Sequence, residues 1–171
     1  MSRPPFAAVS ERDIELVSAQ LGRPARDVIG IAARCSCGAP TVVATSPRLA
    51  DGTPFPTLYY LTHPAATIAV SQLEANGRMA ELSAELAADP ALDATYQTAH
   101  QAYLADRASI LIVEEIDGYS AGGMPTRVKC LHALVGHSLA AGVGLNPIGD
   151  RALAECGWNP EVCACAPEHR G

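Results

Sequence analysis

The spacing of the apolar residues changes at Pro64, and this change constrains the fold more than any other feature of the sequence. Before Pro64, short apolar runs alternate with turn residues, a pattern that predicts strands. After it, apolar residues recur at helical spacing. We expect strands over 28–34, 41–45 and 58–62, and helices over 13–21, 65–74, 78–88, 91–107, 126–141 and 151–156. The sequence therefore predicts an α+β fold, in which a small, mostly antiparallel sheet from the N-terminal half packs with helices from the middle and the C-terminal half.

Two segments are less well defined by this pattern. The apolar stretch 109–114 fits either a fourth strand or a continuation of the preceding helix. No repeat or linker divides the chain, so we expect residues 1–171 to form a single domain. Residues 157–171, which contain two cysteines, are expected to be a flexible tail unless something pins them.

The composition excludes several classes of protein. With 49% hydrophobic and 18% charged residues, the chain is globular and not disordered. The net charge of −6 and the lack of a Lys/Arg run argue against a nucleic-acid partner, because such binders need a basic surface. No apolar run approaches the roughly 20 residues that cross a bilayer, and the N-terminus lacks the apolar region of a secretory signal. We therefore expect a cytoplasmic protein without a membrane partner.

Six cysteines are many for a cytoplasmic chain of 171 residues. Disulfides do not persist in a reducing compartment, which favours metal binding or redox chemistry. The alternative is that these thiols pack as small apolar side chains. They stand at positions 35, 37, 130, 156, 163 and 165.

Two pairs of cysteines have the spacing C-x-C. Cys35 and Cys37 lie in the predicted turn between the first two strands, where they resemble a metal-binding knuckle. The spacing is weaker evidence than C-x-x-C, and an ordinary hairpin turn remains the alternative. Cys163 and Cys165 lie in the tail, which would either wrap over a metal site, act as a redox-active appendage or be disordered.

The predicted helix 126–141 carries Cys130, His132 and His137. Cys130 and His137 share one face but lie roughly 10 Å apart along the axis, too far for one ion. Cys130 and His132 point apart unless the helix begins after Cys130. Because both faces of the helix are apolar, we expect it to be buried on two sides. The helix therefore offers part of a site and needs ligands from other segments.

His63 stands at the start of the next predicted helix, where the helix dipole would lower its pKa and keep it neutral and able to bind a metal. The alternative is an ordinary surface histidine near a helix N-terminus.

Four motifs together resemble a known bacterial family, the domain of unknown function 501. They are Arg34-Cys35 with Gly38-Ala-Pro40, Asp51-Gly-Thr-Pro-Phe-Pro-Thr-Leu-Tyr-Tyr-Leu-Thr-His-Pro64, Gly122-Gly-Met-Pro-Thr-Arg-Val-Lys-Cys-Leu-His-Ala-Leu-Val-Gly-His137 and Asn146-Pro-Ile-Gly-Asp150. The resemblance covers nearly the whole chain. It implies a cytoplasmic bacterial protein, often encoded near a septum-formation protein and an exopolyphosphatase-like enzyme.

The family pattern also implies cysteine at the positions of Cys35 and Cys130, and often at the position of His63. His132 and His137 fit this pattern, whereas Cys37 is less typical of it. Replacement of cysteine by histidine at position 63 keeps metal coordination feasible and favours zinc over an all-cysteine cluster.

These observations favour a metal-binding protein in which Cys35, His63 and Cys130 converge on zinc or an iron–sulfur cluster. The fourth position would be filled by Cys37, His132 or a tail thiol, or would be open and catalytic. Three nearby cations would favour a small anionic substrate or ligand: Arg34, Arg127 and Lys129.

Two other hypotheses remain open. In the first, the protein is a metal-free enzyme with Cys130 as the nucleophile, its pKa lowered by Lys129 and Arg127, and His132 or His63 as the base. In the second, it is a non-catalytic protein with a partner in cell division, which would bind the acidic, alanine-rich helices of 65–107.

Overall fold

The computed structural model describes residues 3–167 and residue 170. Its sheet contains three antiparallel strands in the order β1-β2-β3: β1 (Val28–Arg34), β2 (Pro40–Thr45) and β3 (Tyr59–Leu61). The α-helices are α1 (Glu11–Leu21), α2 (Pro64–Ala75), α3 (Arg78–Ala88), α4 (Pro90–Ala108), α5 (Leu131–Ala141) and α6 (Pro147–Glu155). The predicted α+β class, with an antiparallel sheet from the N-terminal half, is confirmed.

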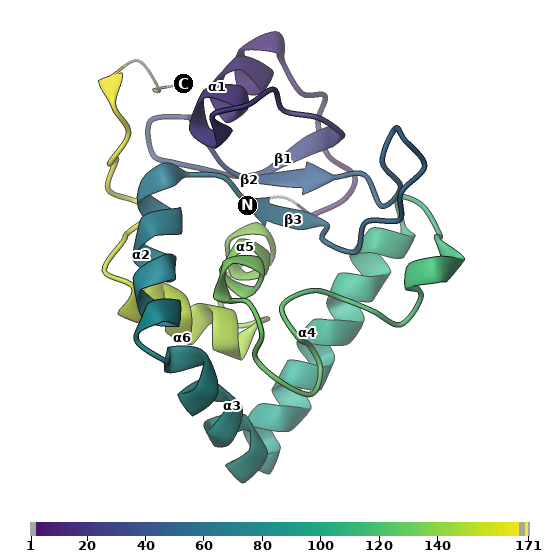
Figure 1. Cartoon of the computed structure of the whole chain (residues 1–171), viewed down its shortest axis with the longest axis vertical. Coiled ribbons are helices and arrows are strands. Elements are labelled where there is room, and N and C mark those ends of the chain that lie inside the picture. Colours follow the sequence, from purple (N-terminus) through teal and green to yellow (C-terminus); the bar gives the residue numbers. More distant parts are fainter. Residues whose placement is uncertain (1–2, 168–169, 171) are drawn as a thin grey trace.

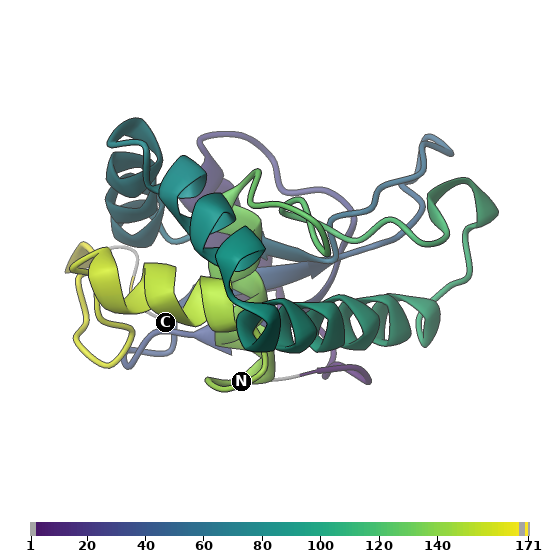
Figure 2. The ribbon, with the colours of Figure 1, turned by 90° about the horizontal axis from the view of Figure 1, so that it is seen from below.

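Helix α5 is the centre of the molecule, with the sheet on one side and α2, α4 and α6 around it (Figure 1). Eight of its residues are buried, and they lie all around the helix: Leu131, Leu134, Val135, Gly136, His137, Ser138, Leu139 and Ala140. The expectation that this helix is buried on both sides is therefore confirmed. Seen from below, α3, α4 and α6 lie across one end of α5 (Figure 2).

The contact between α5 and α6 depends on a glycine. A Cβ atom added at Gly149 would lie 2.2 Å from the carbonyl oxygen of Leu134, so only glycine lets the two backbones approach this closely. Asn146 caps α6 by accepting a hydrogen bond from the Gly149 amide, with a distance of 3.0 Å. This cap explains why α6 begins at Pro147 and not at residue 151 as the apolar spacing suggested.

Helix α5 begins at Leu131, five residues after the expected start at position 126. The residues just before Leu131 are not helical, because their amides form hydrogen bonds with the preceding glycine-rich loop. The amides of Lys129 and Cys130 both donate to the carbonyl of Gly122, at 2.7 and 3.3 Å. Cys130 is thereby held extended, with φ −152° and ψ 109°, as the residue before the helix.

The stretch 109–114 is neither a strand nor a full continuation of α4. The helix ends at Ala108, and a short 3-10 helix follows at Glu114–Ile116. The buried guanidinium of Arg107 holds this connection, since it donates to the carbonyls of Pro56, Ile116 and Tyr119.

The first helix, α1, begins at the capping box that the sequence predicts. Ser10 and Asp13 form the capping box that their spacing predicted, each side chain accepting from the backbone of the other.

Among the described residues, no helix is long and apolar enough to cross a membrane.

Candidate metal centre

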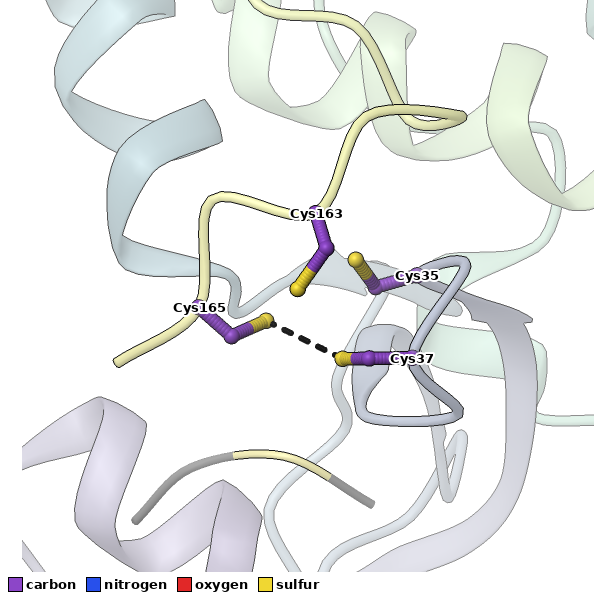
Figure 3. Close-up of side chains that lie close together, drawn as sticks. All are labelled: Cys35, Cys37, Cys163 and Cys165. Carbon is purple, nitrogen blue, oxygen red and sulfur yellow. Dashed lines mark hydrogen bonds between the residues drawn. The ribbon is translucent and has the colours of Figure 1, made fainter. Parts of the chain in front are cut away.

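Four cysteines from two segments far apart in the sequence meet beside the sheet (Figure 3). Cys35 and Cys37 belong to the turn between β1 and β2, and Cys163 and Cys165 belong to the segment after α6. The four sulfur atoms all lie within 4.8 Å of one another. The sulfurs of Cys37 and Cys165 are 3.5 Å apart although the residues are separated by 128 positions.

The β1–β2 turn places its two thiols by backbone hydrogen bonds. The amide of Cys35 donates to the carbonyl of Ala39, and the amide of Gly38 donates to the carbonyl of Cys35, both at 2.8 Å. Gly38 has a φ of 91°, a conformation that favours glycine. The turn therefore folds back on itself and directs both sulfurs to the same side (Figure 3).

Arg34 braces this turn. Its guanidinium donates to the carbonyl of Gly38 at 2.9 Å and to both carboxylate oxygens of Asp13, at 2.7 and 3.0 Å. The hydrogen bonds from Arg34 and Ser10 lower the pKa of Asp13 to about 2, so the carboxylate is charged at neutral pH. Arg34, predicted to bind an anionic ligand, is thus already paired with a carboxylate of α1.

The tail is held by Trp158. Its side chain is only 8% exposed, and its ring lies 5.3 Å from the ring of His63. Because His63 is the N-cap of α2, this contact brings the segment after α6 back to the N-terminal end of α2 (Figure 1).

His63 lies directly beside the cluster of four cysteines. It is the N-cap of α2, and its Nδ1 accepts a hydrogen bond from the Ala66 amide at 3.4 Å. A neutral imidazole that accepts at Nδ1 carries its hydrogen on Nε2, and this atom lies 3.1 Å from the sulfur of Cys165. Burial lowers the pKa of His63, whereas the sequence had suggested the helix dipole as the cause. His63 is therefore a neutral N–H donor toward sulfur.

The cluster has the donor set of a tetrahedral metal site. Two sulfurs bound at about 2.3 Å to one tetrahedral ion lie about 3.8 Å apart, close to the observed Cys37–Cys165 distance of 3.5 Å. Burial is the first cause that raises the pKa of Cys165, and the hydrogen bonds with Cys37 and Cys35 and the charge of Cys35 add to it. A bound cation would stabilise the thiolates of such a cluster. The four cysteines can hold a metal ion.

A second group lies between α2 and the start of α5. Ligand atoms of Glu74, Cys130 and His132 all lie within 4.8 Å of one another. The Nδ1 of His132 is 3.2 Å from Oε1 of Glu74, and its Nε2 is 3.2 Å from the carbonyl oxygen of Thr67 and 3.1 Å from the hydroxyl of Ser71. Cys130 and His132 can meet because the helix begins only after Cys130.

The charges in this second group are coupled. The hydrogen bond with Cys130 is the main cause that raises the pKa of His132 to about 9, and Glu74 adds to it. Burial raises the pKa of Cys130, but the interactions with His132 and with the Ala133 amide outweigh it and leave the pKa below its ordinary value.

The residues expected to form one site are divided between these two groups. Cys35 and Cys37 lie together with the tail thiols, and His63 touches Cys165, but Cys130 belongs to the other group. The reason is the length of α2, since Glu74 lies eleven residues after His63, about 16 Å along a helix axis. The structure therefore does not bring Cys130 to Cys35 and His63.

The other residues singled out in the sequence lie elsewhere. Arg127 and Lys129 are exposed in the loop before α5. His137 is fully buried, and its ring stacks on Tyr59 at 5.7 Å. His137 is therefore a core residue.

Sequence reasoning missed Glu74 and gave the tail thiols only a secondary role. The repeated C-x-C spacing was a signal that the two pairs belong together. Glu74 gave no such signal, because a glutamate near the end of an exposed helix is ordinary.

The model of a family of proteins of unknown function, DUF501, matches residues 31–154. The chain belongs to this family. The matched segment contains Cys35, Cys37 and all of the second group, and it ends before Cys163 and Cys165. No curated protein and no solved structure matches the chain.

Proposed function

We propose that this DUF501 protein binds one zinc ion through Cys35, Cys37, Cys163 and Cys165, and that this ion fastens the C-terminal segment to the β1–β2 turn. The observation that carries the proposal is the convergence of four sulfurs, from two distant C-x-C pairs, within 4.8 Å of one another. Four cysteines complete a tetrahedral shell and leave no position for a substrate, which is the arrangement of structural zinc sites. The role proposed for this centre is therefore structural.

The sulfur distances favour a single ion over an iron–sulfur cluster. In a cluster of several irons, each iron is bound by only some of the cysteines, so their sulfurs are spread around the cluster. Around one ion, all sulfurs are neighbours at about 3.8 Å. Four sulfurs that all lie within 4.8 Å of one another agree better with one ion. Sulfur-only tetrahedral sites suit zinc and iron, and zinc is our choice between them.

His63 supports the bound form of the centre. Four thiolates around a divalent cation leave a net charge of −2, and N–H groups that donate to the sulfurs stabilise this excess charge. The Nε2 of His63, at 3.1 Å from Cys165, is such a donor because its Nδ1 is occupied by the Ala66 amide. We also propose a cytoplasmic location, because cysteine thiolates that bind a metal persist in a reducing compartment.

The test is the metal content of the protein purified without oxygen and without added metal. We expect tightly bound zinc, with one ion fewer per chain in Cys37→Ser and in Cys165→Ser. Cys156→Ser is the matched control, because Cys156 belongs to neither group of candidate ligands and donates instead to the backbone of Leu153. If the purified protein instead contains iron and absorbs strongly in the visible range, the metal of the centre is iron and not zinc. Equal metal content in Cys37→Ser, Cys165→Ser and Cys156→Ser would refute the proposal.

A further inference from the structure

Glu74, Cys130 and His132 form a second set of three different metal-binding groups, apart from the four cysteines. Two are supplied by residues on either side of the start of α5, and the third by the end of α2. All three are partly exposed to solvent. A set of three protein ligands with access to water differs in kind from the closed shell of four cysteines.

The geometry around His132 is that of a metal ligand. Its Nε2 faces the carbonyl oxygen of Thr67, which can only accept a hydrogen bond, so Nε2 carries a hydrogen. Nδ1 faces Oε1 of Glu74, which also accepts, so without a metal Nδ1 donates its own hydrogen to Glu74. A metal bound at Nδ1 would displace this proton, and a backbone carbonyl on the other nitrogen is the usual support of a metal-bound histidine. The distance of 3.2 Å from Nδ1 to Glu74 Oε1 is close to the roughly 3.3 Å expected for two ligands bound at about 2.05 Å to one tetrahedral ion.

Glu74 is fixed in place for this role. Its Oε1 accepts a hydrogen bond from the amide of Leu131, the first residue of α5, at 2.7 Å. The same oxygen faces His132, so one carboxylate oxygen joins the end of α2 to the start of α5. This contact sets the position of Cys130 relative to Glu74, because Cys130 directly precedes Leu131.

The charges of the three groups also favour a cation. A thiolate and a carboxylate carry two negative charges. Without a metal, a protonated His132 balances only one of them, whereas a divalent ion with a neutral imidazole would balance both. A catalytic triad would place the imidazole between thiol and carboxylate, one on each nitrogen. Here the second nitrogen is taken by the Thr67 carbonyl, and Glu74 lies on the side of Nδ1.

We propose that Glu74, Cys130 and His132 bind a second zinc ion whose fourth position is open to water or a small anionic ligand. Three protein ligands and one water are the arrangement of catalytic zinc sites, in which the metal lowers the pKa of its bound water to about 7. The exposed cations Lys129 and Arg127 in the adjacent loop favour an anionic ligand at this position. This site is independent of the four-cysteine centre.

The experiment counts zinc ions per chain by native mass spectrometry after reduced, metal-free protein is titrated with Zn²⁺. We expect two ions for the wild type and for Cys156→Ser, and one fewer for Cys130→Ser. Glu74→Gln is the conservative variant, because its amide oxygen can still accept from Leu131 while the charge is lost. It should weaken binding of this ion at least tenfold, with an unchanged circular dichroism spectrum.

A second measurement uses the unaltered protein. Bound zinc should slow the alkylation of Cys130 by iodoacetamide at least tenfold, measured on the peptide that contains it. The proposal is overturned if Cys130→Ser binds as many ions as the wild type, or if Cys130 is alkylated equally fast with and without zinc. The latter result would mark a free nucleophile. A loss of zinc in Cys130→Ser with no change in Cys37→Ser would keep this site and refute the four-cysteine centre.

Discussion

His137 is a neutral imidazole enclosed by the core. Its ring stacks on Tyr59 and meets the edge of Tyr103 at 5.0 Å, and its Nδ1 lies 3.2 Å from the side-chain amide of Asn146. Burial lowers the pKa of His137 to about 4, and the charges of Asp106 and Arg3 change this only secondarily. The sequence placed His137 on an apolar helix but could not show which imidazole would lose all contact with solvent.

This burial predicts a dependence of stability on pH. Between about pH 6.5 and pH 4 the unfolded chain binds a proton at His137 that the folded chain does not, so stability is full above pH 6.5 and falls as the pH is lowered. At pH 4, the resulting loss of unfolding free energy is about 3 kcal/mol. Urea unfolding of wild type and His137→Gln over this range should show a flatter profile in the variant. Parallel profiles would contradict the burial of a neutral His137.

At the scale of the elements, the apolar spacing located the first four helices within two residues of their observed ends. The apolar spacing did not locate the start of α5, where hydrogen bonds to the preceding loop determine the conformation. The hydrogen bonds of Gly122 hold Cys130 outside α5, and this one extended residue allows Cys130 and His132 to lie close to each other. Such contacts depend on the three-dimensional path of a loop, which the spacing of apolar residues does not encode.

The β1–β2 turn yields a prediction at the same scale. Arg34→Met removes the brace between Asp13 and the carbonyl of Gly38 but changes no metal ligand. We expect zinc affinity at the four-cysteine centre to fall roughly tenfold, about 1.4 kcal/mol, measured by competition with a chelator. Arg23→Met, which removes the same charge just after α1, is the control and should bind zinc like the wild type. Equal affinities in both variants would show that the turn needs no brace.

At the scale of the whole molecule, the cluster of four cysteines lies where the C-terminal segment meets the β1–β2 turn (Figure 3). The sequence indicated metal ligands at Cys35 and Cys37 and offered a tail thiol as one of several candidates for the fourth ligand, but it could not choose among them, because the return of the tail depends on a packing contact. That contact is the burial of Trp158 against His63. Cys130 was expected in the same site, and the length of α2 separates it.

The tail should therefore report the state of the metal centre. Trp158 is the only tryptophan of the chain and is buried when the tail is in place. Removal of zinc with a chelator should expose it, shift its fluorescence emission to longer wavelength, and be reversed by added zinc. In Cys165→Ser the emission should be shifted already and should not respond to zinc. A constant emission during confirmed zinc loss would contradict a tail fastened by the metal.

The most direct test of the central claim is zinc X-ray absorption of the Cys130→Ser variant loaded with one ion. This variant lacks a ligand of the second proposed site, so the signal comes from the four-cysteine centre alone. The account predicts four sulfur neighbours at about 2.3 Å and no nitrogen or oxygen in the first shell. A first shell with nitrogen or oxygen ligands, or with fewer than four sulfurs, would contradict it.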